Sequence, residues 1–245
     1  MPETLFIADL HLDSKKPFFI ELCLDFLAGR ARQADALYIL GDLFEVWLGD
    51  DNDEPAYKPV LAALHNLTQS GIPVFIMHGN RDFLLGSDFL KTTGCQFIED
   101  PYVMDLYAKP TLLMHGDTLC TLDTDYQSFR RQMRNPSWQR HFLEQPLAER
   151  RKLATQTRTI SQARTQMTTK YMMDVTTEAV RAVLEKYGVY QLIHGHIHRP
   201  GIYDECIYNK MALRRVLGEW RDEEVIILSC HPEYCQFIDL LKNNE

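Results

Sequence analysis

Residues 4–11 read Thr4-Leu5-Phe6-Ile7-Ala8-Asp9-Leu10-His11, an apolar run followed by an aspartate and, two residues later, a histidine. A short apolar run of this kind is typical of a buried strand. A helical pattern over residues 17–33, with a proline in its first turn, and a second apolar run over residues 36–40 come next. Strand, helix and strand in this order predict the opening of an α/β fold.

Further apolar runs of strand length and amphipathic runs of helix length follow along the chain. We predict strands at residues 73–77, 111–114, 190–193, 212–217, 224–229 and 236–240, and helices near residues 56–69 and 177–187. The β-α-β opening and the strand-rich end indicate the α/β fold class. We expect two sheets packed as a sandwich and flanked by helices, in the layer order α-β-β-α.

Residues 122–174 interrupt this alternation. The segment lacks β-branched strands, is rich in Arg, Gln, Ala, Leu and Met, and has prolines only at positions 136 and 146. A loop of this length without structure would be unusual in a compact domain. We therefore predict an inserted helical cap at residues 122–174, on a core made of residues 1–121 and 175–245.

The charge of the chain is unevenly distributed. The formal net charge is −8, but residues 130–170 hold ten Lys and Arg against Glu144 and Glu149 only, so this segment carries +8 and the rest about −16. Such asymmetry usually indicates an anionic partner near the basic part. Four apolar residues lie among these cations: Trp138, Phe142, Leu143 and Leu147. The mixture is typical of a segment that binds a membrane surface, and the alternative is a solvated cationic face with the aromatic residues in a local core.

Bulk features predict a cytoplasmic protein. No apolar run approaches the roughly 18 residues of a membrane-spanning helix. The first residues show neither the basic region nor the cleavage site of a secretory signal. Six cysteines are scattered without a C-x-x-C pair, so we expect reduced thiols in the core, and neither disulfides nor a thiolate zinc site.

Polar side chains follow five of the predicted strands directly. They are Asp9 and His11, then Asp42, then Asn80 and Arg81, then His115, and finally His196 and His198. In open α/β sheets, ligands bind at the carboxyl ends of the strands, because the loops there converge on one crevice. We therefore expect these side chains to meet in one place.

Seven of these side chains offer nitrogen or oxygen ligands: Asp9, His11, Asp42, Asn80, His115, His196 and His198. The alternation in Asp9-x-His11 and His196-x-His198 places both members of each pair on one side of an extended backbone. Imidazole and carboxylate ligands without a thiolate suit Mn²⁺, Fe²⁺, Zn²⁺ or Ni²⁺, and the oxygen share favours Mn²⁺. Seven ligands are too many for one ion but suit two ions that share a carboxylate, roughly 3.5–4 Å apart.

Asp42 stands alone at its strand end and is our candidate for the shared carboxylate. We place one ion on Asp9, His11, Asp42 and His198, and the other on Asp42, Asn80, His115 and His196. Each motif taken alone has a plainer explanation, since a Gly-Asp after a strand is usually a turn. All five in this order, each after an apolar run, are hard to explain by turns, and we interpret them as a metal site.

The five blocks resemble the calcineurin-like metallophosphoesterase superfamily, whose pattern is D-x-H, G-D, G-N-H-[DE], a later H, and G-H-x-H. The match covers every metal position between residues 9 and 198. The resemblance implies an enzyme that hydrolyses a phosphate ester or a pyrophosphate with water activated between two divalent cations.

One position departs from that pattern, because Arg81 stands where the superfamily usually has histidine. Arginine stays charged and cannot donate a proton, but its planar guanidinium binds phosphate oxygens. Such a site favours a leaving group that already tolerates negative charge, such as a phosphate. Arg81 therefore favours pyrophosphate cleavage, and the alternative is that it is an incidental surface cation.

A closer resemblance is to the family of UDP-2,3-diacylglucosamine hydrolases, which act in lipid A biosynthesis of Gram-negative bacteria. It is carried by residues 6–12, 37–45, 47, 49–51, 78–84, 113–120 and 192–200, and it covers nearly the whole chain, including the insertion. It implies hydrolysis of UDP-2,3-diacylglucosamine to 2,3-diacylglucosamine 1-phosphate (lipid X) and UMP, with water attacking the α-phosphorus. It also implies a peripheral protein on the cytoplasmic face of the inner membrane, whose anionic surface would attract the basic insertion.

The same resemblance implies contacts with the substrate. Asn80, Arg81 and His196 would contact its phosphate and Asp123 its glucosamine head group. Polar residues of the insertion would contribute at Ser161 and Thr165. The family often has a lysine where this chain has Thr168, and Lys170 lies two residues on, so the source of that positive charge stays open.

Two other classes of function compete with this interpretation. The first is a metallophosphoesterase that acts on a soluble nucleotide pyrophosphate or phosphodiester. The second is a binding scaffold that has lost its metals, but such a scaffold would have replaced its ligand residues, and none is replaced here. We expect no nucleic-acid partner, because the chain outside the basic segment is acidic, and we infer no obligate protein partner.

Overall fold

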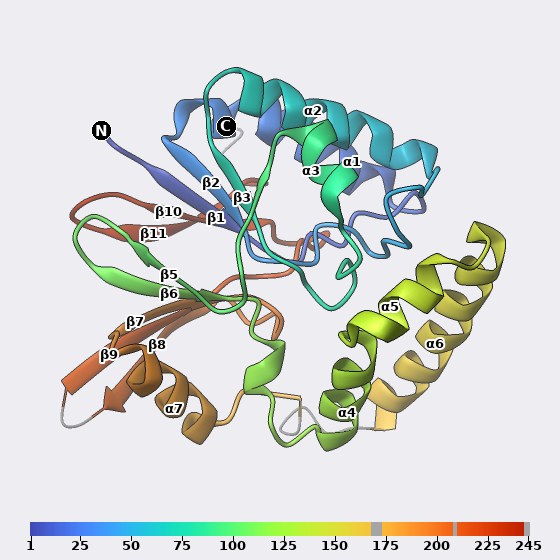
Figure 1. Ribbon diagram of the computed structural model, residues 1–245. Helices are drawn as coiled ribbons and strands as arrows, with labels where there is room; N and C mark the ends of the chain where they lie inside the picture. Colours follow the sequence, from blue (N-terminus) through green and yellow to red (C-terminus); the bar gives the residue numbers. More distant parts are fainter. Residues whose placement is uncertain (168–172, 208–209, 243–245) are drawn as a thin grey trace.

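The computed structural model describes residues 1–167, 173–207 and 210–242, and the side chains from residue 160 to residue 172 are outside that description. Two β-sheets lie face to face (Figure 1). The first has the strand order β11-β10-β1-β2-β3-β4 and the second β5-β6-β7-β9-β8. The strands of the first sheet are β1 (Thr4–Ile7), β2 (Ala36–Ile39), β3 (Val74–Ile76), β4 (Gln96–Phe97), β10 (Ile226–Cys230) and β11 (Cys235–Asp239). Those of the second are β5 (Tyr102–Asp105), β6 (Pro110–Met114), β7 (Gln191–His194), β8 (Gly201–Ile207) and β9 (Lys210–Val216).

The strands that precede the polar blocks run parallel within each sheet. Ile7 of β1 lies opposite Ile39 of β2, which lies opposite Ile76 of β3. In the second sheet, Met114 of β6 lies opposite His194 of β7. The carboxyl ends of these strands therefore end at the same edge of each sheet, as the expected crevice requires.

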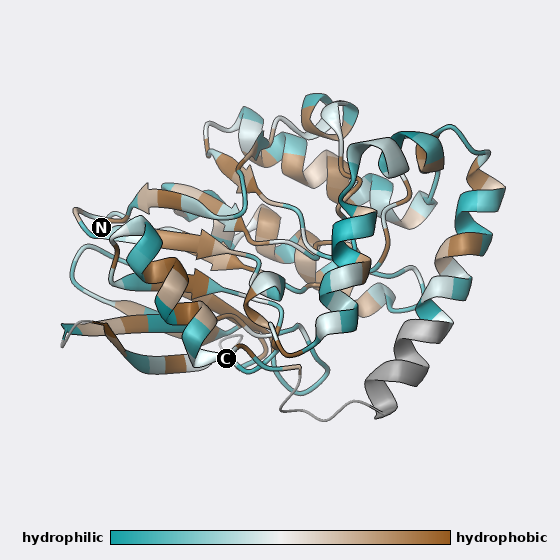
Figure 2. Cartoon of the chain, turned by 60° about the horizontal axis from the view of Figure 1, so that its bottom comes forward, coloured by the Kyte–Doolittle hydropathy of each residue, from teal (hydrophilic) through white to brown (hydrophobic). Residues whose placement is uncertain are grey.

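Alternate residues of the strands build two apolar layers. Leu5 and Ile7 of β1 belong to the cluster beneath α1 (Pro17–Ala28), α2 (Lys58–Gln69) and α3 (Ser87–Thr93). Phe6 belongs to the cluster between the sheets, together with Leu113 and Ile193 of the second sheet. A third cluster lies beneath α7 (Thr177–Tyr187) and includes Val180 and Leu184. The strands are predominantly hydrophobic in Figure 2, and the layer order is α-β-β-α.

The predicted fold class is therefore confirmed, and the differences lie in the short elements. The helix expected over residues 17–33 ends at Ala28, and a 3₁₀ turn, Arg30–Gln33, follows Gly29. Elements α3, β4, β5 and β8 were not predicted. Strand β4 has two residues and helix α3 has seven, too few for a periodic pattern, and β8 mixes polar and apolar residues.

Helices α4 (Thr124–Met133), α5 (Pro136–Leu143) and α6 (Leu147–Met167) occupy the segment predicted to be an inserted cap. They lie beside the edge at which the parallel strands end (Figure 1). No helix within residues 1–167, 173–207 and 210–242 has the length and hydrophobicity to span a bilayer.

The expectation that all cysteines are reduced is wrong for one pair. Cys230 and Cys235 are directly opposite residues of the antiparallel strands β10 and β11, and they form a disulfide. Their separation of five residues across a tight turn gave no C-x-x-C signal. Cys23, Cys95 and Cys120 are free and buried as expected, whereas the free Cys206 is exposed.

Candidate metal centre

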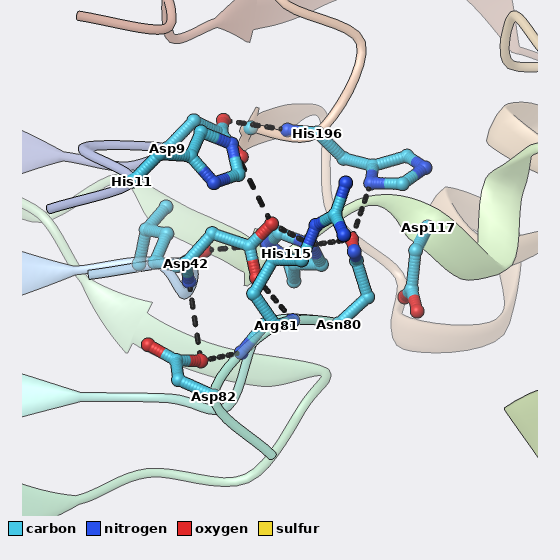
Figure 3. A network of polar contacts seen from close by, with 12 residues as sticks. Asp9, His11, Asp42, Asn80, Arg81, Asp82, His115, Asp117 and His196 are labelled. Carbon is cyan, nitrogen blue, oxygen red and sulfur yellow. Dashed lines mark hydrogen bonds and ion pairs between the residues drawn. The ribbon is translucent and has the colours of Figure 1, made fainter. Parts of the chain in front are cut away.

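The seven predicted metal ligands lie together at the edge shared by the two sheets, and Figure 3 labels all of them except His198. One group consists of Asp9, His11 and His198, and a second of Asp9, Asp42 and His115, with ligand atoms within 4.8 Å of one another. Asn80 and His196 adjoin the second group, because Asn80 Oδ1 lies 3.0 Å from His115 Nε2 and 2.9 Å from His196 Nδ1. Four of the seven follow strands of the first sheet and three follow strands of the second.

Asp42 occupies the middle of the cluster. Its Oδ2 lies 3.8 Å from His11 Nε2 and 3.9 Å from His115 Nε2, the two histidines that we expected on different ions. Its Oδ1 accepts a hydrogen bond of 2.7 Å from the backbone N–H of Arg81. Asp9 also takes part in both groups of ligand atoms. Carboxylates therefore lie where two neighbouring cations would share them.

The backbone conformation of the ligand loops differs from our expectation. Five ligand residues have left-handed backbone: Asp9 (φ 54°), His11 (φ 47°), Asp42 (φ 53°), His196 (φ 71°) and His198 (φ 53°). The idea that each x-spaced pair sits on an extended strand is wrong, because the strands end before these residues. Non-glycine residues in this region cost of order 1–3 kcal/mol each, and such strain gathers at functional sites.

Two glycines allow the ligand carboxylates to approach the backbone closely. A Cβ at Gly79 would overlap Asp42 Oδ1, and a Cβ at Gly195 would overlap Asp9 Oδ2. Asp9 Oδ2 also accepts a hydrogen bond of 2.7 Å from the N–H of His196, the residue after Gly195. Gly79 and Gly195 are therefore required by the close packing of the ligand carboxylates Asp42 and Asp9.

The far nitrogen of each of three ligand histidines lies beside an oxygen of the protein. His115 Nδ1 donates to the carbonyl of Leu40 at 2.9 Å. His11 Nδ1 lies 3.1 Å from Glu45 Oε2, and His198 Nδ1 lies 3.1 Å from Glu219 Oε2. Acceptors of this kind fix the ring and its tautomer, so that Nε2 faces the centre.

Asp82 organises the loops from behind the cluster. It is fully buried, and its carboxylate accepts hydrogen bonds from the backbone N–H of Gly79 (2.8 Å) and Leu43 (2.8 Å), with Asp42 N–H at 3.3 Å. Burial, with the nearby charge of Asp42, raises the pKa of Asp82 to about 6. The residue thus joins the loop after β2 to the loop after β3.

The charges of the cluster favour added cations. Burial lowers the pKa of His115, but Asp42 and the other carboxylates outweigh it and raise the value to about 9. Burial is likewise outweighed at His198, where contacts with Asp9 and Glu219 raise the pKa to about 10. At His196, burial and the neighbouring His115 lower the pKa to about 3. The carboxylates therefore draw positive charge into the centre, and bound metal ions would displace the histidine protons.

One buried oxygen supplies a test of whether cations fit. Asp9 is fully buried, and its Oδ1 has no hydrogen-bond donor among the described residues. His198 Nε2 faces it at 3.5 Å. An uncompensated buried carboxylate oxygen is costly, whereas coordination of a cation satisfies it. The residues present therefore fit divalent cations.

The residues predicted to contact the substrate have different positions. Asn80, Arg81 and His196 lie in or beside the cluster (Figure 3). Asp123 caps the first turn of α4, where its Oδ1 accepts a hydrogen bond from Tyr126 N at 3.1 Å. Ser161 and Thr165 belong to the backbone of α6, but their side chains lie outside the described part, and Thr168 lies outside the described residues altogether.

Sequence reasoning did not assign roles to Glu45 and Glu219. Glu45 contacts Arg158 of α6 at 2.8 Å as well as His11, and Arg81 Nη1 lies 4.0 Å away. Glu45 lies three residues after Asp42, and this short spacing was the one feature of the sequence that could have suggested a place near the metal centre. Glu219 lies beyond β9, more than twenty residues after His198, and only the fold brings it to the histidine.

Comparisons with known proteins agree with this geometry. The family model of the calcineurin-like phosphoesterases matches residues 3–200. A Cellvibrio japonicus protein named UDP-2,3-diacylglucosamine hydrolase is 49% identical over 90% of this chain and 92% of its own length. Proteins of the same name from Xanthomonas oryzae pv. oryzae (48% identical, 91% of this chain and 94% of that protein) and Salmonella paratyphi C (47%, 90% and 92%) are similarly related.

The match is long and includes all five polar blocks, since residues 9–198 fall within the part that the family model covers. The structure brings the ligand residues of those blocks to one edge. The chain therefore belongs to the calcineurin-like phosphoesterase family.

Proposed function

We propose that the chain hydrolyses the pyrophosphate bond of UDP-2,3-diacylglucosamine and releases 2,3-diacylglucosamine 1-phosphate and UMP, a step of lipid A biosynthesis. The observation that carries this proposal is the buried cluster centred on Asp42, whose Oδ2 lies about equally far from His11 and His115. It occurs in a chain that is 47–49% identical to UDP-2,3-diacylglucosamine hydrolases over about nine tenths of its length.

The metal centre of this proposal uses the seven predicted ligands. Asp9, His11, Asp42 and His198 would hold one divalent cation, and Asp42, Asn80, His115 and His196 the other. When bound, the two cations would activate water and stabilise negative charge on the phosphate oxygens. The mixture of imidazole and carboxylate ligands favours Mn²⁺ as their identity.

The protein groups around the centre position the reacting phosphate. Asn80 Oδ1 lies between His115 and His196, so its amide is fixed at the edge of the cluster. The backbone N–H of Arg81 holds Asp42, while its side chain is one-third exposed and has Nη1 4.0 Å from Glu45 Oε1. A guanidinium at this position binds phosphate oxygens and stays charged, which suits a sugar 1-phosphate as the leaving group.

The cap supplies the other substrate contacts in this proposal. Residues 122–174 act as a cap on a core of residues 1–121 and 175–245. Asp123 binds the glucosamine head group, and Ser161, Thr165 and Thr168 contribute along the segment that includes α6. An aromatic cluster of Phe83, Trp138 and Phe142 joins the cap to the core, with ring centroids 6.4 Å apart for Phe83 and Trp138 and 5.0 Å apart for Trp138 and Phe142.

We also infer that the protein binds the anionic cytoplasmic face of the inner membrane peripherally. Trp138, Phe142 and Leu147 pack against the main core, so they are not available to a membrane. Leu143 and Leu153 are about two-fifths exposed, and they lie near the exposed cations Arg140 and Lys152. Exposed apolar and basic residues together are typical of a weak interfacial contact.

The reaction is tested with two substrates and identified products. Detergent-solubilised UDP-2,3-diacylglucosamine and soluble UDP-glucose are incubated with the Mn²⁺-loaded protein, and the nucleotide product is separated. We expect UMP from the lipid substrate and little turnover of UDP-glucose. Release of UDP, or equal turnover of both substrates, would contradict the proposal and favour a phosphoesterase of soluble nucleotides.

Membrane binding has a separate test. Sedimentation with vesicles of phosphatidylethanolamine and phosphatidylglycerol should retain the protein at low salt and release it at high salt, because surface charge interactions are screened. Neutral phosphatidylcholine vesicles are the control. Equal binding to both vesicles, or none to either, would contradict an electrostatic contact.

A further inference from the structure

Asp117 is a buried carboxylate that the metal centre does not use. It lies two residues after His115, is fully buried, and does not belong to either group of ligand atoms. Its Oδ2 accepts two hydrogen bonds of 2.6 Å, from the hydroxyl of Tyr126 and from Nε of Arg130. Both donors belong to α4, the first helix of the cap.

The residues of α4 that point inward share one face of the helix. Tyr126 and Arg130 of α4, and Arg134 at its C-cap, follow at intervals of four residues, so they project from the same side. These three are half-buried, whereas their neighbours Phe129 and Arg131 are exposed. An inward helix face made of polar residues is unusual, because helices normally dock through an apolar stripe.

The third member of this face reaches a metal-ligand loop directly. Arg134 Nη2 donates to the carbonyl of Gly79 at 2.8 Å. Gly79 precedes Asn80, and its Cα lies against the carboxylate of Asp42. At the other end of the face, the ring of Tyr126 lies 5.8 Å from the ring of His196. One side of α4 thus contacts the loops after β3, β6 and β7.

The same helix carries a substrate-contact candidate. Asp123 is the N-cap of α4, and its Oδ1 accepts from the backbone N–H of Tyr126 at 3.1 Å. The side-chain amide of Gln127 donates to the backbone carbonyl of Asp117 at 2.8 Å. Any rotation or shift of α4 would therefore move Asp123 relative to the metal centre. Two charge-assisted bonds to one buried carboxylate oppose such a shift.

We propose that Asp117 is a positioning residue that docks α4 on the metal loops through Tyr126 and Arg130, and so places Asp123 for the glucosamine head group. In this proposal, Asp117 affects binding of the substrate and does not affect binding of the metal ions. The proposal rests on the proposed function for the identity of the head group, whereas the docking itself does not depend on it.

The test compares two substitutions on neighbouring residues of α4. Arg130→Met removes the inward guanidinium, and Arg131→Met makes the same change on the exposed face. For each protein we would measure hydrogen exchange of the peptide covering α4, the Mn²⁺ content, and KM and kcat for UDP-2,3-diacylglucosamine.

For Arg130→Met we expect exchange in α4 and KM to rise about tenfold each, while kcat changes by less than about threefold and two Mn²⁺ ions remain, as a misplaced binding group predicts. Arg131→Met should behave as the unmodified chain. Unchanged exchange and KM, or loss of Mn²⁺ together with kcat, would overturn the proposal.

Asp117→Asn serves as a second variant, because it keeps the shape of the side chain in the event that Arg130→Met fails to fold. It should loosen α4 and raise KM in the same direction. If the unmodified chain does not hydrolyse the lipid substrate, the proposed function fails. The exchange of α4 and the Mn²⁺ content then still decide whether Asp117 docks the helix.

Discussion

The metal edge of the core and the cap that covers it are held by different means. At the edge, Asp9, Asp42 and His115 are almost completely buried, and backbone hydrogen bonds and close glycines fix their positions. The cap meets the core mainly through side-chain ties, such as Arg158 to Glu45 and Arg150 to Asp51. Backbone contacts therefore fix the ligand cluster, whereas individual side chains hold helices α4–α6 against the core.

The cations of the cap illustrate this difference. Our expectation from the sequence was that the +8 of residues 130–170 faces an anionic partner. Among the described side chains, five cations of that segment contact groups of the protein itself: Arg130, Arg134, Arg150, Arg151 and Arg158. Part of the basic charge therefore attaches the cap to acidic and carbonyl groups of the core.

The largest expected effect concerns the centre itself. Asp42→Ala removes the carboxylate between His11 and His115, so both cations should be lost and the rate should fall by more than about 10⁴-fold. Metal content by mass spectrometry and turnover of the lipid substrate measure this, with Asp222→Ala at an exposed position as the control. Near-normal activity of Asp42→Ala would refute the shared-carboxylate assignment.

A smaller loss of activity should follow when one methyl group is added beside the carboxylate of Asp42. Gly79→Ala places a Cβ against Asp42 Oδ1, and we expect a loss of about 10²–10³-fold in kcat/KM with weakened metal binding. Gly71→Ala is the control for adding a methyl group, because Gly71 has open space around its Cβ position, although its positive φ adds backbone strain that Gly79 lacks. The control should cost about 1 kcal/mol of stability and leave activity unchanged. Equal effects on kcat/KM at both glycines would contradict the role of overlap with Asp42.

The next effect separates phosphate binding from metal binding. Arg81→Ala should reduce the rate about 10- to 100-fold, the size of one or two charge-assisted hydrogen bonds (~1.5–3 kcal/mol), while both ions stay bound. The measurement is kcat together with Mn²⁺ content, and exposed Arg32→Ala is the control. Loss of metal in Arg81→Ala would mean that the residue supports Asp42 more than it serves the substrate.

Attachment of the cap can be tested at two adjacent arginines. Arg150 is 2% exposed and donates to the carbonyls of Leu48 (2.5 Å) and Gln145 (2.9 Å) as well as to Asp51, whereas Arg151 and its partner Asp53 are exposed. Arg150→Met should lower the free energy of unfolding by about 1–3 kcal/mol. Arg151→Met should change it by less than about 0.5 kcal/mol. Urea denaturation measures the free energy of unfolding of both variants. Similar losses for the two would contradict the distinction between the buried and the exposed ion pair.

The smallest effect is a dependence of stability on pH. Burial lowers the pKa of His78 to about 4 in the folded chain, against 6.5 for the free side chain, although its Nε2 donates to Leu85 O at 2.8 Å. The unfolded chain therefore binds the extra proton between pH 6.5 and 4, and stability falls as the pH drops through this window. In metal-free protein, His78→Gln should reduce the loss between pH 7 and pH 5 by about 1–2 kcal/mol, as measured by urea denaturation. The same change at exposed His65 should leave the loss unchanged.

The parts of the fold and of the metal centre that could be predicted are those that depend on residues close together in the sequence. Apolar runs and the polar residues after them identified the sandwich and the seven ligand candidates, because strand ends are local features. The left-handed backbone of Asp9 and Asp42 was not predicted, because tertiary hydrogen bonds and close packing select it. Glu219 and Asp117 acquire their partners only through the fold, so spacing along the chain did not reveal them.

The ligand cluster also bridges the seam of the sandwich. Asp9 and Asp42 come from one sheet and His115 and His196 from the other, and the N–H of Trp220 joins the second side to the carbonyl of Asp9 at 3.2 Å. Ions bound there would link the two sheets. A small shift of one sheet relative to the other would therefore change the distances between the ligands and weaken coordination. Substitutions that change the packing of Phe6 or Ile193, which are buried between the sheets, should therefore weaken metal affinity.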